Sequence, residues 1–312
     1  MTLAESVLRG SPQAVARLIS LVENRPAEAV PVLRLLHPHT GRGYVVGVTG
    51  PPGSGKSTLI DALVRTVRRG GRRVGVVAVD PTSPFSGGAI LGDRIRMQEH
   101  STDPGVFVRS MATRGHLGGL APAASAAVEV LDAYGCDLIL VETVGTGQAE
   151  VDIVGAADTV LVVTVPHLGD AIQTLKAGIM EIGDVFVVNK ADRGDADRTA
   201  TEIKMMLGLA PDRGGWHPPV LLTTATGGTG IPEVGEAIER HRGYQTAHGL
   251  LAGRRQGRRR QEILMIIEER LRERVIGRAG RPRLDALAAR VAQGELDPYT
   301  AAETLLADAG IR

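Results

Sequence analysis

The sequence feature that most constrains the fold is the run Gly50–Ser57, which reads GPPGSGKS. An apolar run typical of a buried strand precedes it over residues 44–49, and a stretch with helical periodicity follows from residue 58. A glycine-rich turn between a strand and a helix lets successive backbone N–H groups point inward around a phosphate chain. The first turn of the helix adds its dipole. The run therefore predicts a strand, a phosphate-binding loop and a helix.

Within this run the residue types have distinct expected roles. Lys56 is expected to reach the β- and γ-phosphates of a nucleotide, and the Ser57 hydroxyl is expected to hold Mg²⁺. The predicted phosphate site comprises Gly50, Pro51, Pro52, Gly53, Ser54, Gly55, Lys56, Ser57 and Thr58.

Two carboxylates follow in the next part of the chain. Asp80 ends a short apolar run over residues 73–79, and Asp93 follows a segment rich in proline and glycine over residues 81–92. A long irregular segment beside a phosphate loop is usually functional, and it can order around Mg²⁺ and a γ-phosphate. Asp93 is therefore a candidate metal ligand, with the N-terminal acid of a helix as the alternative. Asp80 is a further candidate near the metal.

A third carboxylate ends the buried run over residues 137–142. Glu142 would stand at the C-terminal end of a parallel strand beside the phosphate loop, which is a suitable place to orient Mg²⁺. Gly145 is placed to donate its N–H to a γ-phosphate, so the two residues fill the pattern D-x-x-G with Glu for Asp. Gln148 lies three residues beyond Gly145, not directly after it, and differs there from the water-orienting glutamine of small GTPases.

The second decisive motif is N-K-x-D, which follows an apolar run over residues 185–188. The Asp192 carboxylate can accept hydrogen bonds from N1–H and the 2-amino group of guanine. Adenine has neither donor, so the same carboxylate penalises it. Asn189 is expected to tie this loop to the phosphate loop, and the Lys190 stem to lie along the purine. One strand and one helix later, the small residues Thr224, Ala225 and Thr226 are expected to contact the guanine oxygen.

Composition limits the remaining classes of function. The 312 residues carry 36 basic and 35 acidic side chains, so no global field draws the chain to nucleic acid or to a membrane. One cysteine excludes an internal disulfide framework. No apolar run approaches the ~20 residues of a membrane span. We expect a cytoplasmic protein with no nucleic-acid or membrane partner.

The order of these segments predicts an α/β fold, a P-loop NTPase with a mostly parallel sheet flanked by helices and with helical extensions at both ends. The expected domains are an N-terminal helical arm over residues 1–40, a nucleotide domain over 41–244 and a C-terminal helical extension over 245–312. We expect residues 106–108 to form a short strand and residues 109–119 a loop. The charged amphipathic helix expected over 250–275 needs a surface to cover its apolar stripe, and a second copy of the chain is the expected cover.

Taken together, these motifs resemble those of the methylmalonyl-CoA mutase-associated GTPases, the MeaB/ArgK-type, MMAA-like family within the signal-recognition and MinD-like branch of P-loop GTPases. The resemblance covers nearly the whole chain. Its most specific stretches are residues 80–84, 87–97, 141–145, 147–148, 178–182, 189–192 and 294–299.

The resemblance implies a Mg²⁺-dependent GTPase that cycles between GTP and GDP. It implies a chaperone for an adenosylcobalamin-dependent acyl-CoA mutase, which gates cofactor loading and protects the mutase, and a homodimer joined through the C-terminal extension. It also implies a third mobile segment over residues 166–176, after those at 81–97 and 143–150, in which Asp170 and Lys176 match the coupling acid and lysine. His167 and Leu168 depart from the small residues usual there. The full candidate catalytic set is Lys56, Asp93, Glu142, Gly145, Gln148, Asp170 and Lys176, and the metal set is Ser57, Asp80, Asp93 and Glu142.

Two alternatives remain open from the residues alone. One is a P-loop ATPase or kinase of the ArgK transport type, which the N-K-x-D motif opposes. The other is a metallochaperone GTPase, which usually carries clustered Cys and His, whereas Cys136 is the sole cysteine and the eight histidines are scattered.

Overall fold

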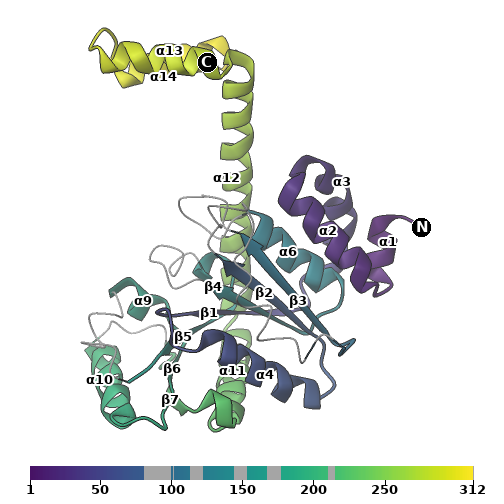
Figure 1. Ribbon diagram of the computed structural model, residues 1–312, viewed down its shortest axis with the longest axis vertical. Helices are drawn as coiled ribbons and strands as arrows, with labels where there is room; N and C mark the ends of the chain where they lie inside the picture. Colours follow the sequence, from purple (N-terminus) through teal and green to yellow (C-terminus); the bar gives the residue numbers. More distant parts are fainter. Residues whose placement is uncertain are drawn as a thin grey trace. The chain divides into compact units, whose positions relative to one another are not determined.

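The computed structural model describes residues 1–80, 100, 102–112, 122–143, 153–166, 177–209 and 215–311 (Figure 1). The chain divides into two compact units, Met1–Arg255 and Gln256–Arg312. The three-part division expected from the sequence, with boundaries at residues 41 and 245, stays a prediction.

A seven-stranded sheet forms the centre of the first unit, with the order β3-β2-β4-β1-β5-β6-β7. Neighbouring strands run parallel throughout, so the predicted α/β fold is confirmed. The order places β1 in the middle, and the carboxyl ends of all strands meet at one edge. The strands are β1 (Tyr44–Thr49), β2 (Val74–Asp80), β3 (Val106–Ala112), β4 (Leu138–Thr143), β5 (Thr159–Thr164), β6 (Val185–Asn189) and β7 (Val220–Thr223).

Helices cover both faces of this sheet, and each face has its own apolar core. One core joins the sheet to α4 (Lys56–Arg69) and α11 (Ile231–Ala247). The other joins it to the helices α6 (Pro122–Ala133), α9 (Ala177–Ile182) and α10 (Ala196–Leu209), the short turn η3 (Ile153–Gly155) and the N-terminal helices α1 (Leu3–Leu8), α2 (Pro12–Asn24) and α3 (Pro26–Leu36). Three elements remain to be named. They are η1 (His37–His39), which comes after α3, η4 (Ala225–Gly227), which comes after β7, and α12 (Leu250–Ala279), which comes after α11. The second unit contains the rest of α12 with α13 (Arg281–Ala292) and α14 (Pro298–Asp308).

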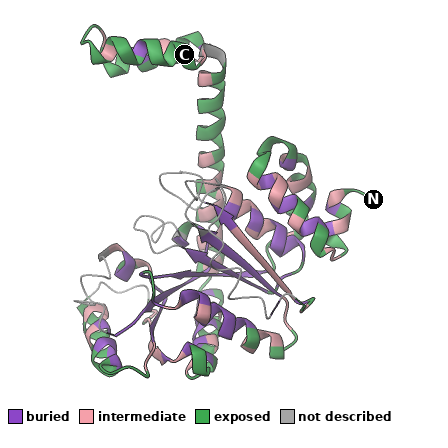
Figure 2. Cartoon of the chain, in the orientation of Figure 1, coloured by how far each residue is buried: buried purple, intermediate pink, exposed green. Residues whose placement is uncertain are grey.

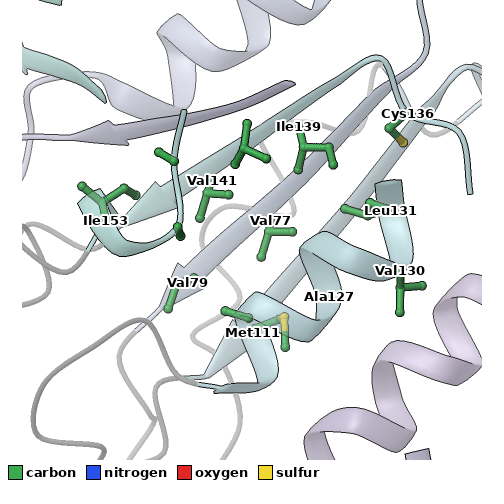
Figure 3. Packing of buried hydrophobic residues seen from close by; sticks show 14 of the residues in the cluster. Val77, Val79, Met111, Ala127, Val130, Leu131, Cys136, Ile139, Val141 and Ile153 are labelled. Atoms are coloured by element: carbon green, nitrogen blue, oxygen red, sulfur yellow. The ribbon is translucent and has the colours of Figure 1, made fainter. Parts of the chain in front are cut away.

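The central strands are buried on both faces, as Figure 2 shows. This explains why they read as continuous apolar runs instead of alternating ones. Successive side chains still point to opposite faces, so Ile139 and Val141 of β4 belong to one core while Leu138 and Leu140 belong to the other. Figure 3 shows the core that contains Ile139 and Val141, where Val77 and Ile139 face Leu131 of α6.

The structure corrects one element expected from the sequence. β3 extends to Ala112, so residues 109–112 are strand and not loop, because the pairing with β2 continues in register from Val74↔Val106 to Asp80↔Ala112. The glycines of residues 115–119 favoured a loop that begins at Arg109. Its guanidinium instead forms an ion pair with Glu23 of α2 and donates a hydrogen bond to Ser20 Oγ at 3.0 Å. The N-terminal arm thereby supplies the counter-charge that lets an arginine sit in an edge strand.

A polar network occupies the amino-terminal edge of the sheet, opposite the edge that carries the sequence motifs. Asp158 and Asp184 stand just before β5 and β6 and accept N–H bonds from Val45 and Val160 at 3.0 and 2.8 Å. Arg254 of α12 pairs with Asp184 at 2.9 Å, and Arg255 pairs with Asp158 at 2.8 Å. Buried carboxylates need such partners to remain charged. We call these four charged residues the amino-edge network, and within the first unit it fastens the first residues of α12 to the sheet.

His241 of α11 is buried beside this network. Its Nδ1 shares a hydrogen bond with Thr159 Oγ1 at 2.8 Å, and the same hydroxyl lies 2.6 Å from the Tyr44 hydroxyl. Burial lowers the pKa of His241, and the carboxylate of Asp184 only partly offsets this. The ring lies 4.7 Å from the Trp216 ring, so the single tryptophan reports on this region.

The lowered pKa of His241 predicts a loss of stability in mild acid. In the unfolded chain this histidine titrates near its ordinary pKa of about 6.5, so it takes up a proton there before it does in the folded protein. The unfolded state then binds more protons, and stability falls as the pH drops below about 6.5. Urea unfolding followed by Trp216 fluorescence between pH 7.5 and 5.5 should show a shallower decline for His241→Gln than for the natural protein.

The matched control is His248→Gln, because His248 is exposed just after the same helix. It should keep the decline of the natural protein. Identical pH dependence in His241→Gln and the natural protein would contradict the prediction.

The described residues contain no helix with the length and apolar content that a membrane crossing requires.

Candidate functional site

The loop between β1 and α4 needs glycine at particular positions. Gly50 has φ +135°, and a Cβ there would lie 2.0 Å from the Val163 carbonyl oxygen of β5. Gly55 has φ +87°, and a Cβ there would lie 2.5 Å from Asn189 Nδ2. Side chains are excluded by both conformation and space. The loop therefore passes between β5 and the N-K-x-D motif with backbone alone.

Lys56 begins α4, and its side chain folds back over the loop. The ammonium donates hydrogen bonds to the Gly50 and Pro51 carbonyl oxygens at 2.8 and 3.2 Å. The residue is buried, so the positive charge is held in a water-poor place against the loop. A cation fixed here attracts phosphate oxygens more strongly than an exposed lysine does, because the local dielectric is low.

Ser57 and Glu142 meet on the same face of the sheet. Ser57 Oγ donates a hydrogen bond to Glu142 Oε1 at 2.8 Å, and each residue is 5% exposed. The hydroxyl comes from the first turn of α4 and the carboxylate from the end of β4. Hard oxygen donors of this kind suit Mg²⁺, so this pair fits a metal beside the phosphate loop.

Asn189 links three segments of the site. Its Nδ2 donates to the Ser54 carbonyl oxygen at 2.9 Å, which connects β6 to the phosphate loop. Its Oδ1 accepts from Thr223 Oγ1 and from the Ala225 N–H, each at 3.1 Å. The Asn189 amide therefore holds the phosphate loop and the turn at residues 224–226 at a fixed separation.

Lys190 and Asp192 follow with different surroundings. Lys190 has φ +57°, which is uncommon for a residue with a side chain, and its Nζ donates to the Gly53 carbonyl oxygen at 2.8 Å. This bond gives a second link to the phosphate loop and accounts for the tolerance of the strained backbone. Asp192 is exposed, so its carboxylate is accessible to the nucleobase of a nucleotide that approaches from the solvent. In the turn beyond β7, Ala225 is buried and Thr226 is exposed.

The structure thus brings together Lys56, Ser57 and Glu142 around the loop, and Asn189 with the turn at residues 224–226. Asp80 is the last residue of β2, at the same edge of the sheet. Five further candidates lie outside the described residues, so the structure gives no placement for them: Asp93, Gly145, Gln148, Asp170 and Lys176.

Thr223 was missed in the sequence analysis. It ends β7 directly beside Asn189, with which it is paired in register, and its hydroxyl orients the Asn189 amide. The available signal was a polar residue that ends an apolar strand at the edge where the other motifs lie.

Comparison with known proteins decides the family. A family model described as methylmalonyl Co-A mutase-associated GTPase MeaB matches residues 15–279. The chain belongs to this family. The resemblance and the GTPase activity predicted from the sequence are thereby confirmed.

Curated relatives of this MeaB-family chain agree with that assignment. A putative GTPase of Pyrococcus abyssi is 53% identical over 97% of this chain and 95% of its own length. The GTPase ArgK of Escherichia coli is 36% identical over 82% of this chain and 80% of its own length. The mouse protein named methylmalonic aciduria type A homolog, mitochondrial, is 35% identical over 84% of this chain and 65% of its own length.

A solved structure supports the MeaB-family fold. The crystal structure of a protein titled LAO/AO transport system kinase aligns with a TM-score of 0.73 and 26% identity, over 97% of this chain and 95% of that chain.

The exposed carboxylate of Asp192 leads to a prediction about base selectivity. In Asp192→Asn the two hydrogen bonds from guanine to a charged acceptor are lost, so GTP affinity should fall about a hundredfold. An amide can donate to the C2 carbonyl of xanthine, which replaces the 2-amino group of guanine. Xanthosine triphosphate should therefore bind the variant better than GTP does, as competition against fluorescent GDP can measure.

Asp195→Asn is a control for this prediction, because Asp195 is exposed in the same loop but outside the motif. It should bind GTP as the natural protein does. Unchanged GTP-over-ATP selectivity in Asp192→Asn would remove Asp192 from the guanine site.

Proposed function

We propose that this MeaB-family GTPase requires Mg²⁺ and serves as a chaperone for an adenosylcobalamin-dependent acyl-CoA mutase, gating cofactor loading and protecting the mutase. The observation that carries the proposal is the family match over residues 15–279, whose description names association with methylmalonyl-CoA mutase. The name of the mouse relative also refers to methylmalonic aciduria.

The requirement for Mg²⁺ is supported by the contact between Ser57 and Glu142. Both oxygens are buried and 2.8 Å apart at the end of the phosphate loop. When bound, the ion would neutralise charge on the β- and γ-phosphate oxygens. The residues that would hold it are Ser57 and Glu142, with Asp80 and Asp93 as further candidates.

The residues of the chain itself bind and position the nucleotide. Lys56 and the loop N–H groups hold the phosphates, while Asn189 fixes the phosphate loop relative to the turn beyond β7. Transfer of a phosphoryl group to water needs positioning and charge neutralisation more than covalent chemistry. We propose that the chain alone hydrolyses GTP slowly and that the mutase accelerates the reaction by holding Gly145, Gln148 and Asp170 in a catalytic arrangement.

Single-turnover GTP hydrolysis with and without a mutase tests this function. A cognate mutase should raise the rate about a hundredfold, which is the size of effect expected from one correctly placed catalytic group. Methylmalonyl-, isobutyryl- and ethylmalonyl-CoA mutases are the clients to compare. Lys56→Ala should abolish hydrolysis with and without the mutase. Equal rates with and without every mutase would contradict the chaperone proposal.

We also propose that the C-terminal helices join two copies of the chain. Within the second unit, α12 exposes a stripe of large apolar side chains, and Ile263 and Leu264 are 58% and 49% exposed. The stripe continues through Ile266, Ile267 and Leu271. Such a helix face is stable in water only when another apolar surface covers it, and a twofold copy of the same stripe is the simplest cover.

Light scattering at micromolar concentration should give twice the mass of one chain. Ile263→Glu with Ile267→Glu places charge in the covered stripe and should give the mass of one chain. Leu35→Glu is the matched control, since Leu35 is 60% exposed on α3 and outside the stripe. A natural protein with the mass of a single chain would contradict the dimer.

A further inference from the structure

The end of β4 contacts both ends of the phosphate loop. Glu142 and Thr143 are consecutive, so their side chains point to opposite faces of the sheet. On one face Glu142 accepts the hydrogen bond of Ser57, the last residue of the loop. On the other face Thr143 Oγ1 donates to Oγ1 of Thr49 at 3.1 Å, and Thr49 directly precedes the loop. The Val48 carbonyl oxygen of the same strand is a more distant acceptor for this hydroxyl, at 3.5 Å. Two adjacent residues of one strand therefore hold both flanks of the loop.

The contact between the two threonines is fully enclosed. Thr49 is 0% and Thr143 is 2% exposed. They are neighbours because β1 and β4 pair in parallel with Val48 opposite Glu142, which places Thr49 beside Thr143 one residue further on. A hydrogen bond without competing water holds its two atoms at a narrow range of distances.

The opposite side of the loop entrance leaves no room for adjustment. Gly50 lies against β5, where even a Cβ would come within 2.0 Å of the Val163 carbonyl oxygen. The chain at Thr49 and Gly50 is thus confined between β5 and the Thr143 hydroxyl. Movement of the end of β4 would displace the loop entrance, and with it the Ser57–Glu142 spacing.

A purely structural role would not need these hydroxyls. The same face of β4 carries Ile139 and Val141, and the strand pairing already fixes the register. Two valines would have nearly the shape of two threonines without the cost of burying hydroxyl groups. The hydroxyl pair lies at the carboxyl end of the strands, at the level of the phosphate loop.

We propose that Thr143 is a positioning residue of the nucleotide site, whose hydroxyl bond to Thr49 fixes the loop entrance relative to Glu142 and so sets the spacing between Ser57 and Glu142 for Mg²⁺. The inference rests on the proposed Mg²⁺ dependence of the GTPase. In this proposal Thr143 acts through Thr49 and Glu142 and not by direct contact with nucleotide or metal.

The test compares Thr143→Val, which removes the hydroxyl but keeps the shape, with Thr143→Ser, which keeps the hydroxyl. The dissociation constant of fluorescent GDP is measured in EDTA and in Mg²⁺. The readout is the first constant divided by the second, which is the factor by which Mg²⁺ tightens binding. Loss of one buried hydrogen bond should reduce this factor about fivefold in Thr143→Val. Binding in EDTA should change by less than about twofold, because the guanine contacts and loop N–H groups remain.

Two comparisons separate positioning from general destabilisation. Thr143→Ser should keep the factor of the natural protein. Thr159→Val removes an equally buried hydroxyl at the amino-terminal edge, where it bonds to Tyr44 and His241. That variant should lose thermal stability and keep the factor, so stability loss and metal coupling are measured independently.

Thr49→Val removes the same bond from the other partner and should reduce the factor as Thr143→Val does; it also serves if Thr143→Val fails to fold. The inference would be overturned if either valine variant kept the Mg²⁺ factor of the natural protein. It would also be overturned if Thr143→Ser lost as much of this factor as Thr143→Val. If Mg²⁺ changed neither the GDP binding nor the GTP turnover of the natural protein, the proposed Mg²⁺ dependence itself would be overturned.

Discussion

The site depends on one steric constraint, the passage of the chain from β1 into α4 against the backbone of β5. At Gly50 the nearest atom to an added Cβ would be a carbonyl oxygen 2.0 Å away, and backbone in the middle of a sheet cannot yield. The turn at this point directs the loop over the carboxyl end of β1. The Lys56 ammonium then reaches back to the Gly50 carbonyl oxygen, and Ser57 comes to rest against Glu142.

The sheet has two edges with different physical roles. At the carboxyl edge, Lys56 and the exposed Asp192 are the polar groups expected to meet a ligand, and Asn189 ties their loops together. At the amino edge, Asp158 and Asp184 are satisfied by backbone N–H groups and by Arg254 and Arg255. β5 and β6 run between these two sets of polar groups and are buried on both faces along their length. The strands therefore form a rigid support whose polar groups lie only at the ends, one set for the ligand and one for α12.

Much of this arrangement was predictable from the sequence, and the exceptions have a common cause. The loop, the order of strand and helix, and the N-K-x-D motif are local patterns, so Gly50–Ser57 and Asn189 could be found without a structure. The extent of β3 could not, because Arg109 is stable in a strand only when Glu23 from a distant helix meets it. The contact between Thr49 and Thr143 likewise depends on the register of strands far apart in the chain. Local chemistry is readable in sequence, whereas the partner of a buried polar group is set by topology.

Topology also relates the nucleotide site to the parts of the chain that carry Gly145, Gln148 and Asp170, the residues that the mutase is proposed to hold. The ranges 81–99, 144–152 and 167–176 begin at or just after the carboxyl ends of β2, β4 and β5. β4 and β5 flank β1, and β2 lies beside β4, so all three ranges leave the sheet around the phosphate loop. Asp93, Gly145, Gln148, Asp170 and Lys176 belong to these ranges. A partner that binds to these ranges would act next to the strand ends that flank the phosphate loop, which is consistent with the proposal that GTP hydrolysis and mutase binding are coupled without a long-range pathway.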